Sequence, residues 1–176
     1  MGRRTVARVA LAAAWLGALA ACVVNLSFDM DQPGIPLQTT GAGPVSQNVA
    51  IDLTSYGDVR DHQNDIRSLD LDSVDVTITS VNPGNLAQTV SATLTLRKNL
   101  ADPSTEVKIG DVSGLQVLRN SRQQIRGNPA LDAFLLERLH DGGKFYLLLS
   151  GTSDAKIDAV VDVLLHASMG YETGLF

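Results

Sequence analysis

Apolar and polar residues alternate along most of the chain from Gln47 onward. In SVDVTITSV, Val74, Val76 and Ile78 occupy every second position, and polar residues separate them. The same period of two recurs in several other segments: 47–54, 89–97, 144–151 and 157–169, with shorter runs at 107–109, at 115–118 and around Ile125. Successive side chains of a strand point to opposite faces, so this pattern predicts antiparallel strands with one buried face. About seven or eight such strands favour a mainly β fold, an antiparallel β-sandwich.

The apolar side of these runs defines the expected core. Its members are Ile51, Val76, Ile78, Leu94, Leu96, Leu147, Val161 and Val163. Two turn sequences separate neighbouring runs. VNPGN (81–85) places Pro83-Gly84 between two strands, and GTSDAK (151–156) predicts a hairpin between the last two strands. Asp158 and Asp162 alternate with apolar residues in the last run, so we expect them to face solvent.

Two short helices are expected between the strands. The first would begin at Ser55, with Ser55 and Asp58 in the spacing of a helix cap, and would extend to about Arg67. The second has a stronger pattern, because Asn128 fits an N-cap position and Pro129 fits the first helical position. Its apolar stripe would seal one open end or face of the sandwich and comprises Leu131, Phe134, Leu135 and Leu139. Gly142-Gly143 would end this helix.

The segment before the alternating runs is rich in proline and glycine. DQPGIPLQTTGAGPVS, residues 31–46, holds three prolines and three glycines, which favours a flexible tether. In NLSFDMD, however, Leu26, Phe28 and Met30 alternate with polar residues and fit a strand that pairs with the domain edge. In that case the tether would be shorter.

The first 21 residues have the features of a secretory signal. Arg3, Arg4 and Arg8 make a basic start, and the apolar run VALAAAWLGALAA follows at 9–21. This run is shorter than the ~20 apolar residues that a spanning helix needs. A basic start, a short apolar run and small residues at its end are typical of a signal peptide.

Leu19-Ala20-Ala21-Cys22 resembles the lipobox of bacterial lipoproteins, and Cys22 is the only cysteine of the chain. The resemblance implies that the Cys22 sulfur carries a diacylglycerol, that cleavage occurs before Cys22 and that its new amino group is often acylated too. Two or three acyl chains are enough for stable anchoring. Val23 follows, and by the same resemblance the absence of aspartate there favours the outer membrane. We therefore divide the chain into a signal peptide (1–21), a lipidated N-terminus with its tether (22–46) and a sandwich domain (47–176) in which 47–171 should fold alone.

Removal of 21 of the 176 residues would leave 155 residues, enough for one domain with its own core. It would also remove three arginines and change the formal net charge from −5 to −8. A chain this acidic lacks the excess of basic residues that binding to nucleic acid requires. The membrane contact should therefore be the lipid and not a basic face.

The sequence contains no recognisable catalytic or cofactor motif. It has no HExxH, no Gly-x-Ser-x-Gly, no phosphate loop and no cysteine pair for zinc, so we expect no cofactor. His62, His140 and His166 lie far apart, and His166 is expected on the polar face of the last strand.

Acidic residues are the only clustered chemical groups. Asp58, Asp61 and Asp65 alternate with arginines, which favours a solvated mixed-charge face. Asp70, Asp72 and Asp75 are candidate calcium ligands, with Asp29 and Asp31 as further contributors. The segment lacks the glycine and the distant glutamate of an EF-hand.

Three functions remain open. The first is a non-enzymatic, lipid-anchored binding or scaffolding sandwich for an envelope protein or polysaccharide. The second is an envelope-polymer hydrolase that uses paired carboxylates. The third is a calcium-dependent adhesion module that uses Asp70, Asp72 and Asp75. The fold alone does not choose among them.

Overall fold

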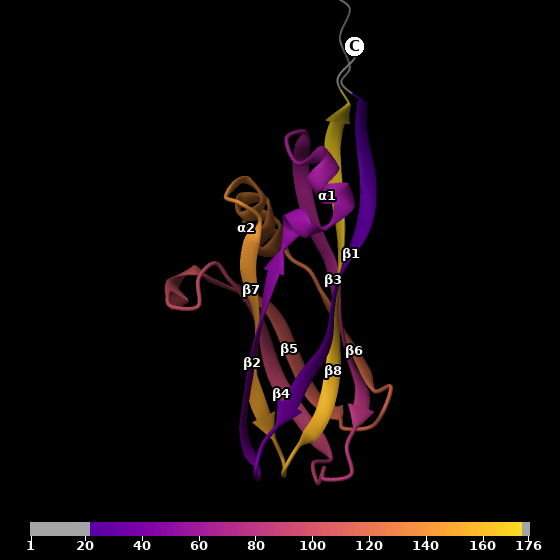
Figure 1. Cartoon of the computed structure of the whole chain (residues 1–176), viewed down its shortest axis with the longest axis vertical. Helices are drawn as coiled ribbons and strands as arrows, with labels where there is room; N and C mark the ends of the chain where they lie inside the picture. Colours follow the sequence, from indigo (N-terminus) through magenta and orange to yellow (C-terminus); the bar gives the residue numbers. More distant parts are fainter. Residues whose placement is uncertain (1–21, 174–176) are drawn as a thin grey trace, which may run out of the picture.

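A computed structural model describes residues 22–173, which form two packed four-stranded antiparallel sheets (Figure 1). The strands are β1 (Cys22–Gln38), β2 (Gly43–Asp52), β3 (Ile66–Val81), β4 (Thr89–Arg97), β5 (Glu106–Gln116), β6 (Arg122–Arg126), β7 (Lys144–Ser153) and β8 (Asp158–Thr173). The helices are α1 (Gly57–His62) and α2 (Pro129–His140), with 3₁₀ turns η1 (Leu53–Ser55) and η2 (Pro103–Thr105). The predicted mainly β sandwich with two short helices is confirmed.

The chain passes repeatedly from one sheet to the other. One sheet has the order β1-β8-β3-β6 and the other β2-β7-β4-β5, so β4 and β5 are the only consecutive strands that pair within these 152 residues, 22–173. This arrangement is jelly-roll-like. The predicted hairpin at GTSDAK is wrong, because β7 and β8 lie in different sheets and the turn bridges the two layers. Alternation identifies a strand but not its partner.

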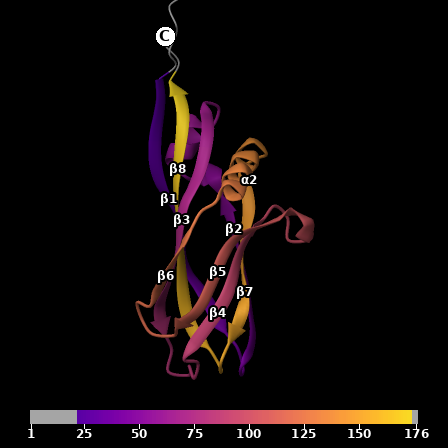
Figure 2. The ribbon, with the colours of Figure 1, turned by 180° about the vertical axis from the view of Figure 1, so that it is seen from behind.

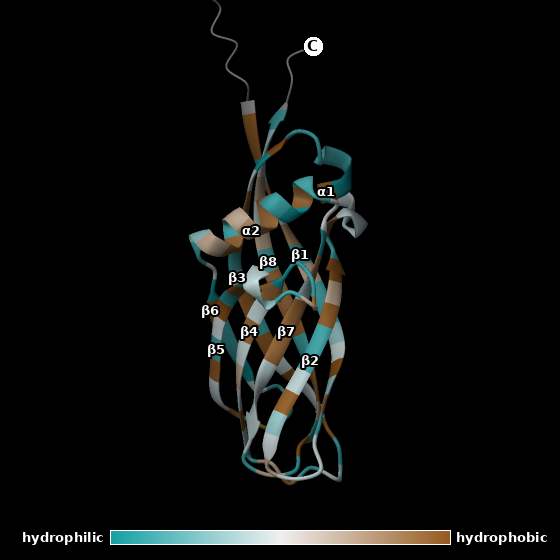
Figure 3. Ribbon diagram, turned by 90° about the vertical axis from the view of Figure 1, so that its left-hand side faces the viewer, coloured by the Kyte–Doolittle hydropathy of each residue, from teal (hydrophilic) through white to brown (hydrophobic). Residues whose placement is uncertain are grey.

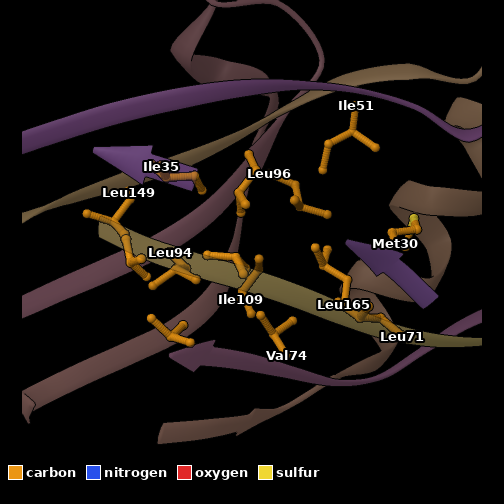
Figure 4. Close-up of a cluster of buried hydrophobic side chains, with 14 of the residues drawn as sticks. Met30, Ile35, Ile51, Leu71, Val74, Leu94, Leu96, Ile109, Leu149 and Leu165 are labelled. Atoms are coloured by element: carbon orange, nitrogen blue, oxygen red, sulfur yellow. The ribbon is translucent and has the colours of Figure 1, made fainter. Parts of the chain in front are cut away.

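The core lies between the two sheets, where side chains from both inner faces meet (Figure 4). All eight residues predicted for the core are buried, as are the four of the α2 stripe. Met30 and Ile35 of β1 lie in the same cluster as Leu94 and Leu96 of β4. The hydropathy colouring changes repeatedly along single strands, as expected when one face packs inward (Figure 3).

The Pro/Gly-rich segment is not a flexible tether. Residues 22–38 form β1, which pairs with β8 along its length, and residues 43–52 form β2, which pairs with β7. Both are edge strands, where prolines are tolerated because one side of the backbone needs no partner. Pro33 and Gly34 occupy a bulge in β1, and the Gly34 N–H donates to Asp162 (2.8 Å). The strand pattern predicted for Leu26, Phe28 and Met30 is confirmed and extends further than expected.

The two helices differ in how well the sequence predicts them. The first is shorter than expected, since α1 ends at His62 and Ile66 already begins β3. Its N-cap is Tyr56, without a side-chain bond, and not Ser55. The second begins as predicted: Asn128 Oδ1 accepts from the N–H groups of Ala130 (3.0 Å) and Leu131 (3.3 Å). It ends before Gly142 and Gly143, which both have positive φ.

The molecule is elongated, and its two ends differ (Figures 1 and 2). At one end, which we call the β1 end, β1 begins and β8 finishes, and α1 lies beside these strands. The connections between β1 and β2, β3 and β4, β5 and β6, and β7 and β8 lie at the opposite end. Helix α2 contacts β3 of one sheet and β5 and β7 of the other, so it closes the open side between the layers, as predicted.

Candidate functional site

The candidate lipidation residue, Cys22, lies at the β1 end. It is the first residue of β1, and its backbone is in register with Thr173 of β8. Leu19, Ala20 and Ala21, which carry the lipobox resemblance, lie outside the described residues together with the rest of 1–21. Within residues 22–173, no helix is long and apolar enough to cross a membrane.

The three candidate calcium ligands do not converge. Asp70 and Asp72 are exposed on β3, and Asp72 accepts a long bond from the Ser168 hydroxyl (3.3 Å). Asp75 is buried and binds cationic groups instead. Over the described chain, no three His, Cys, Asp or Glu side chains form a group that could hold a metal ion. A carboxylate already neutralised by cations is a poor ligand for calcium.

A row of charged side chains crosses the outer face of the β1-β8-β3-β6 sheet, one from each strand. His166 of β8 lies at its centre: Nδ1 is 2.7 Å from Asp29 Oδ1 on β1, and Nε2 is 2.8 Å from Asp75 Oδ2 on β3. Arg122 of β6 donates to the same Asp75 oxygen. We call these four residues the sheet ladder. It links all four strands by side chains, in addition to their backbone bonds.

The ladder perturbs the protonation of its central members. The hydrogen bond to Asp75, reinforced by Asp29, raises the pKa of His166 despite partial burial. Burial alone would raise the pKa of Asp75, but hydrogen bonds from Arg122 and His166 outweigh it and lower that pKa. Two carboxylate partners require both ring nitrogens to donate, so the geometry favours the imidazolium. A ring whose two nitrogens are both occupied cannot take a proton from a substrate, so His166 is not placed as a general base.

The other histidines and acids stay apart from this ladder. His62 stacks on Tyr171 with ring centroids 4.0 Å apart, and His140 is exposed at the end of α2. Asp58, Asp61 and Asp65 lie in and just after α1, where Asp61 pairs with the exposed Arg60. The mixed-charge interpretation of this segment fits that placement.

A cleft of about 310 Å³ lies between α2 and the connection from β4 to β5. We call it the α2 cleft. The helix contributes Ala130, Ala133, Phe134, Glu137 and Arg138, the connection contributes Lys98, Ser104 and Thr105, and the start of β5 contributes Glu106 and Val107. This site was not among the sequence predictions. One signal was present, because Arg138 falls four residues after Phe134 on a helix side where an apolar residue would be expected.

Comparisons with known proteins identify no family for this chain. No family model matches the chain, and no curated protein sequence matches it. Solved structures that are similar include turnip yellow mosaic virus, at 13% identity and a TM-score of 0.40 over 99% of this chain and 93% of that one. Desmodium yellow mottle tymovirus shows 10% identity and a TM-score of 0.40, over 88% and 90% of the two chains. The decameric BFDV capsid protein shows 10% identity and 0.39, over 84% and 99%. At these identities and TM-scores, the similarities carry no conclusion about this chain.

Proposed function

We propose that this protein is a bacterial envelope lipoprotein, anchored by acyl chains on Cys22, whose sandwich is a non-enzymatic module that binds an envelope protein or polysaccharide. The observation that carries the proposal is the LAAC tetrapeptide at the end of a short apolar run. The position of Cys22 is compatible with it, since β1 begins there at one end of an elongated domain. A lipid on that residue would hold the β1 end against the membrane and leave the opposite end free.

No linker separates Cys22 from the sandwich, because β1 begins at Cys22 itself. Because β1 is paired with β8 from its first residue, the lipidated cysteine would be joined directly to the sandwich, without a flexible linker between them. Val23, directly after the cysteine, favours outer-membrane residence by the lipoprotein resemblance. The arrangement suits a module that binds its partner close to the membrane surface.

The test is fractionation of the full chain and its Cys22→Ser variant, expressed in a Gram-negative host. We expect the parent in the outer-membrane fraction of a density gradient and the variant released from it, because stable anchoring needs the acyl chains. Ser27→Ala, a one-atom change at an exposed position of β1, is the control and should fractionate like the parent. Full membrane retention of the Cys22→Ser variant would refute the anchor, and recovery of the parent mainly with the inner membrane would refute the location.

A further inference from the structure

The walls of the α2 cleft come from α2 on one side and from the β4–β5 connection with η2 on the other. Ala130 and Ala133 lie one turn apart on α2 and leave room that larger side chains would fill. Facing them, η2 is fixed by Asp102, whose Oδ1 accepts from the Ser104 N–H (3.0 Å) and from its hydroxyl (2.6 Å). These two bonds fix the η2 wall of the cleft.

Arg138 is the unusual residue of the cleft. Its side chain is only 2% exposed, although arginine is rarely buried to this degree. The guanidinium donates to Asp141 (2.8 Å) and to Glu137 (2.5 Å), while its buried Nε–H has no acceptor in the described structure. A buried donor without an acceptor is energetically costly.

The charges around the cleft are balanced. Asp141 pairs with both Lys98 (2.7 Å) and Arg138, Glu137 pairs with Arg138, and Glu106 pairs with Arg97. Of the residues that line the cleft, two are cations, Lys98 and Arg138, and two are carboxylates, Glu106 and Glu137. An anionic ligand would have to displace Asp141 or Glu137 from Arg138, and a cationic ligand would have to displace an arginine or lysine from an acid. An uncharged ligand faces neither cost.

Hydroxyl groups suit this set of partners. A hydroxyl donates to a carboxylate and accepts from a cation at once, and such charge-assisted bonds are stronger than neutral ones. The hydroxyls of Ser104 and Thr105 already donate to Asp102, so they add two neutral acceptors. Phe134, which packs near the Arg138 guanidinium with 5.9 Å from carbon to ring centroid, and the two alanines give an apolar wall.

We propose that the α2 cleft binds one or two uncharged sugar units of a polysaccharide. The proposal specifies the ligand of the binding module proposed above, and it rests on that function for the source of the sugar. The cleft volume is at the lower end of the range for small-molecule sites, which fits a unit of this size and not a long segment.

Titration calorimetry of the full chain tests this inference, in a detergent without a sugar headgroup. The probes are cellobiose, maltose and chitobiose, with digalacturonate as the anionic comparison. At least one neutral disaccharide should bind saturably, with a dissociation constant of about 1 mM or lower. Ala133→Leu fills the cleft from an exposed helix position and should weaken binding by about tenfold or more. Glu137→Gln should weaken it by a few fold, because it replaces a charged acceptor with a neutral one.

Ala50→Leu, an equally sized change on exposed β2 outside the cleft, is the control and should bind as the parent does. Circular dichroism confirms that each variant is folded. The inference fails if no neutral probe binds with a dissociation constant of about 1 mM or lower, if Ala133→Leu binds like the parent, or if digalacturonate binds more tightly than every neutral probe. Each readout is independent of membrane retention, so loss of the anchor proposal and loss of the sugar site are distinguishable.

Discussion

At the scale of single residues, the face of a side chain can be read from the sequence, but its partners cannot. Alternation places His166 on the polar side of the last strand, and it is half-buried there. Nothing local indicates that Asp29, 137 residues earlier, lies 2.7 Å away. The sheet ladder exists because β1 and β3 flank β8, an arrangement that depends on the topology of the whole chain.

His166→Gln should destabilise the protein more at acidic than at alkaline pH. Because the folded pKa of His166 is raised, its contribution is fully present below the unfolded value of about 6.5 and is lost as pH rises through the folded pKa. The lowered pKa of Asp75 keeps that partner ionised above about pH 3.9, and its contribution is lost as pH falls through its folded pKa. We expect a loss of about 1–2 kcal/mol at pH 5, measured by urea unfolding, and a smaller loss at about pH 9.

Asp29→Asn is the matched variant, because it weakens one side of the ladder and leaves Asp75 in place. Its loss should be smaller and should decline with pH in the same direction. A difference between parent and His166→Gln that grows toward alkaline pH would show that the histidine is not held as an imidazolium.

At the scale of elements, prediction succeeds where local chemistry decides the structure. Helix α2 combines a side-chain cap, a proline at its first position and an apolar stripe, so its limits were predictable. Helix α1 has no side-chain cap and is only six residues long. The helical pattern after His62 is weak, and Ile66 pairs with β8 as part of β3 instead. The α2 cleft was not predictable, because its two walls are joined only by tertiary packing.

Phe134→Ala should be much more destabilising than Asp158→Ala. The Phe134 ring is buried edge-to-face on Phe145, with centroids 5.8 Å apart, and its loss should cost about 3–5 kcal/mol. Asp158 also contributes to stability, since its carboxylate accepts hydrogen bonds from the side chains of Asn82 (2.7 Å) and Gln38 (3.3 Å). Its removal should cost about 1 kcal/mol. Thermal unfolding of both variants makes the comparison, and a larger loss for Asp158→Ala would contradict the assignment of inner and outer faces.

At the scale of the whole molecule, composition misled where the alternation did not. Three prolines and three glycines between 31 and 46 favour a tether, yet these residues belong to two edge strands and the turn between them. Edge strands tolerate such residues, so a Pro/Gly-rich segment beside a sheet is compatible with either state. The apolar side chains that β1 buries in the core determine that this segment is a strand and not a tether. They are Phe28, Met30, Ile35 and Leu37.

These four side chains make β1 part of the folding unit. A chain that begins at residue 47 would lose them and leave β8 as an unpaired edge, contrary to the expectation that 47–171 folds alone. Removing even one large core side chain typically costs ~2–5 kcal/mol, and a whole domain is stable by only about 5–15 kcal/mol. We therefore expect residues 47–176 alone to show no cooperative thermal transition, whereas residues 22–176 with Cys22→Ser should unfold cooperatively.

Adding β1 back as a separate peptide makes this last prediction specific. A peptide of residues 22–46 with Cys22→Ser returns β1 and the start of β2 with its buried Val45. It should pair with the shortened chain and restore a cooperative transition, because an exposed sheet edge accepts an added strand through backbone hydrogen bonds. The same peptide with Met30→Asp is the control and should fail, since Met30 is fully buried and a charge there has no partner. If the shortened chain unfolds cooperatively without any peptide, β1 is an accessory to the sandwich, and Cys22 would be attached to a detachable strand.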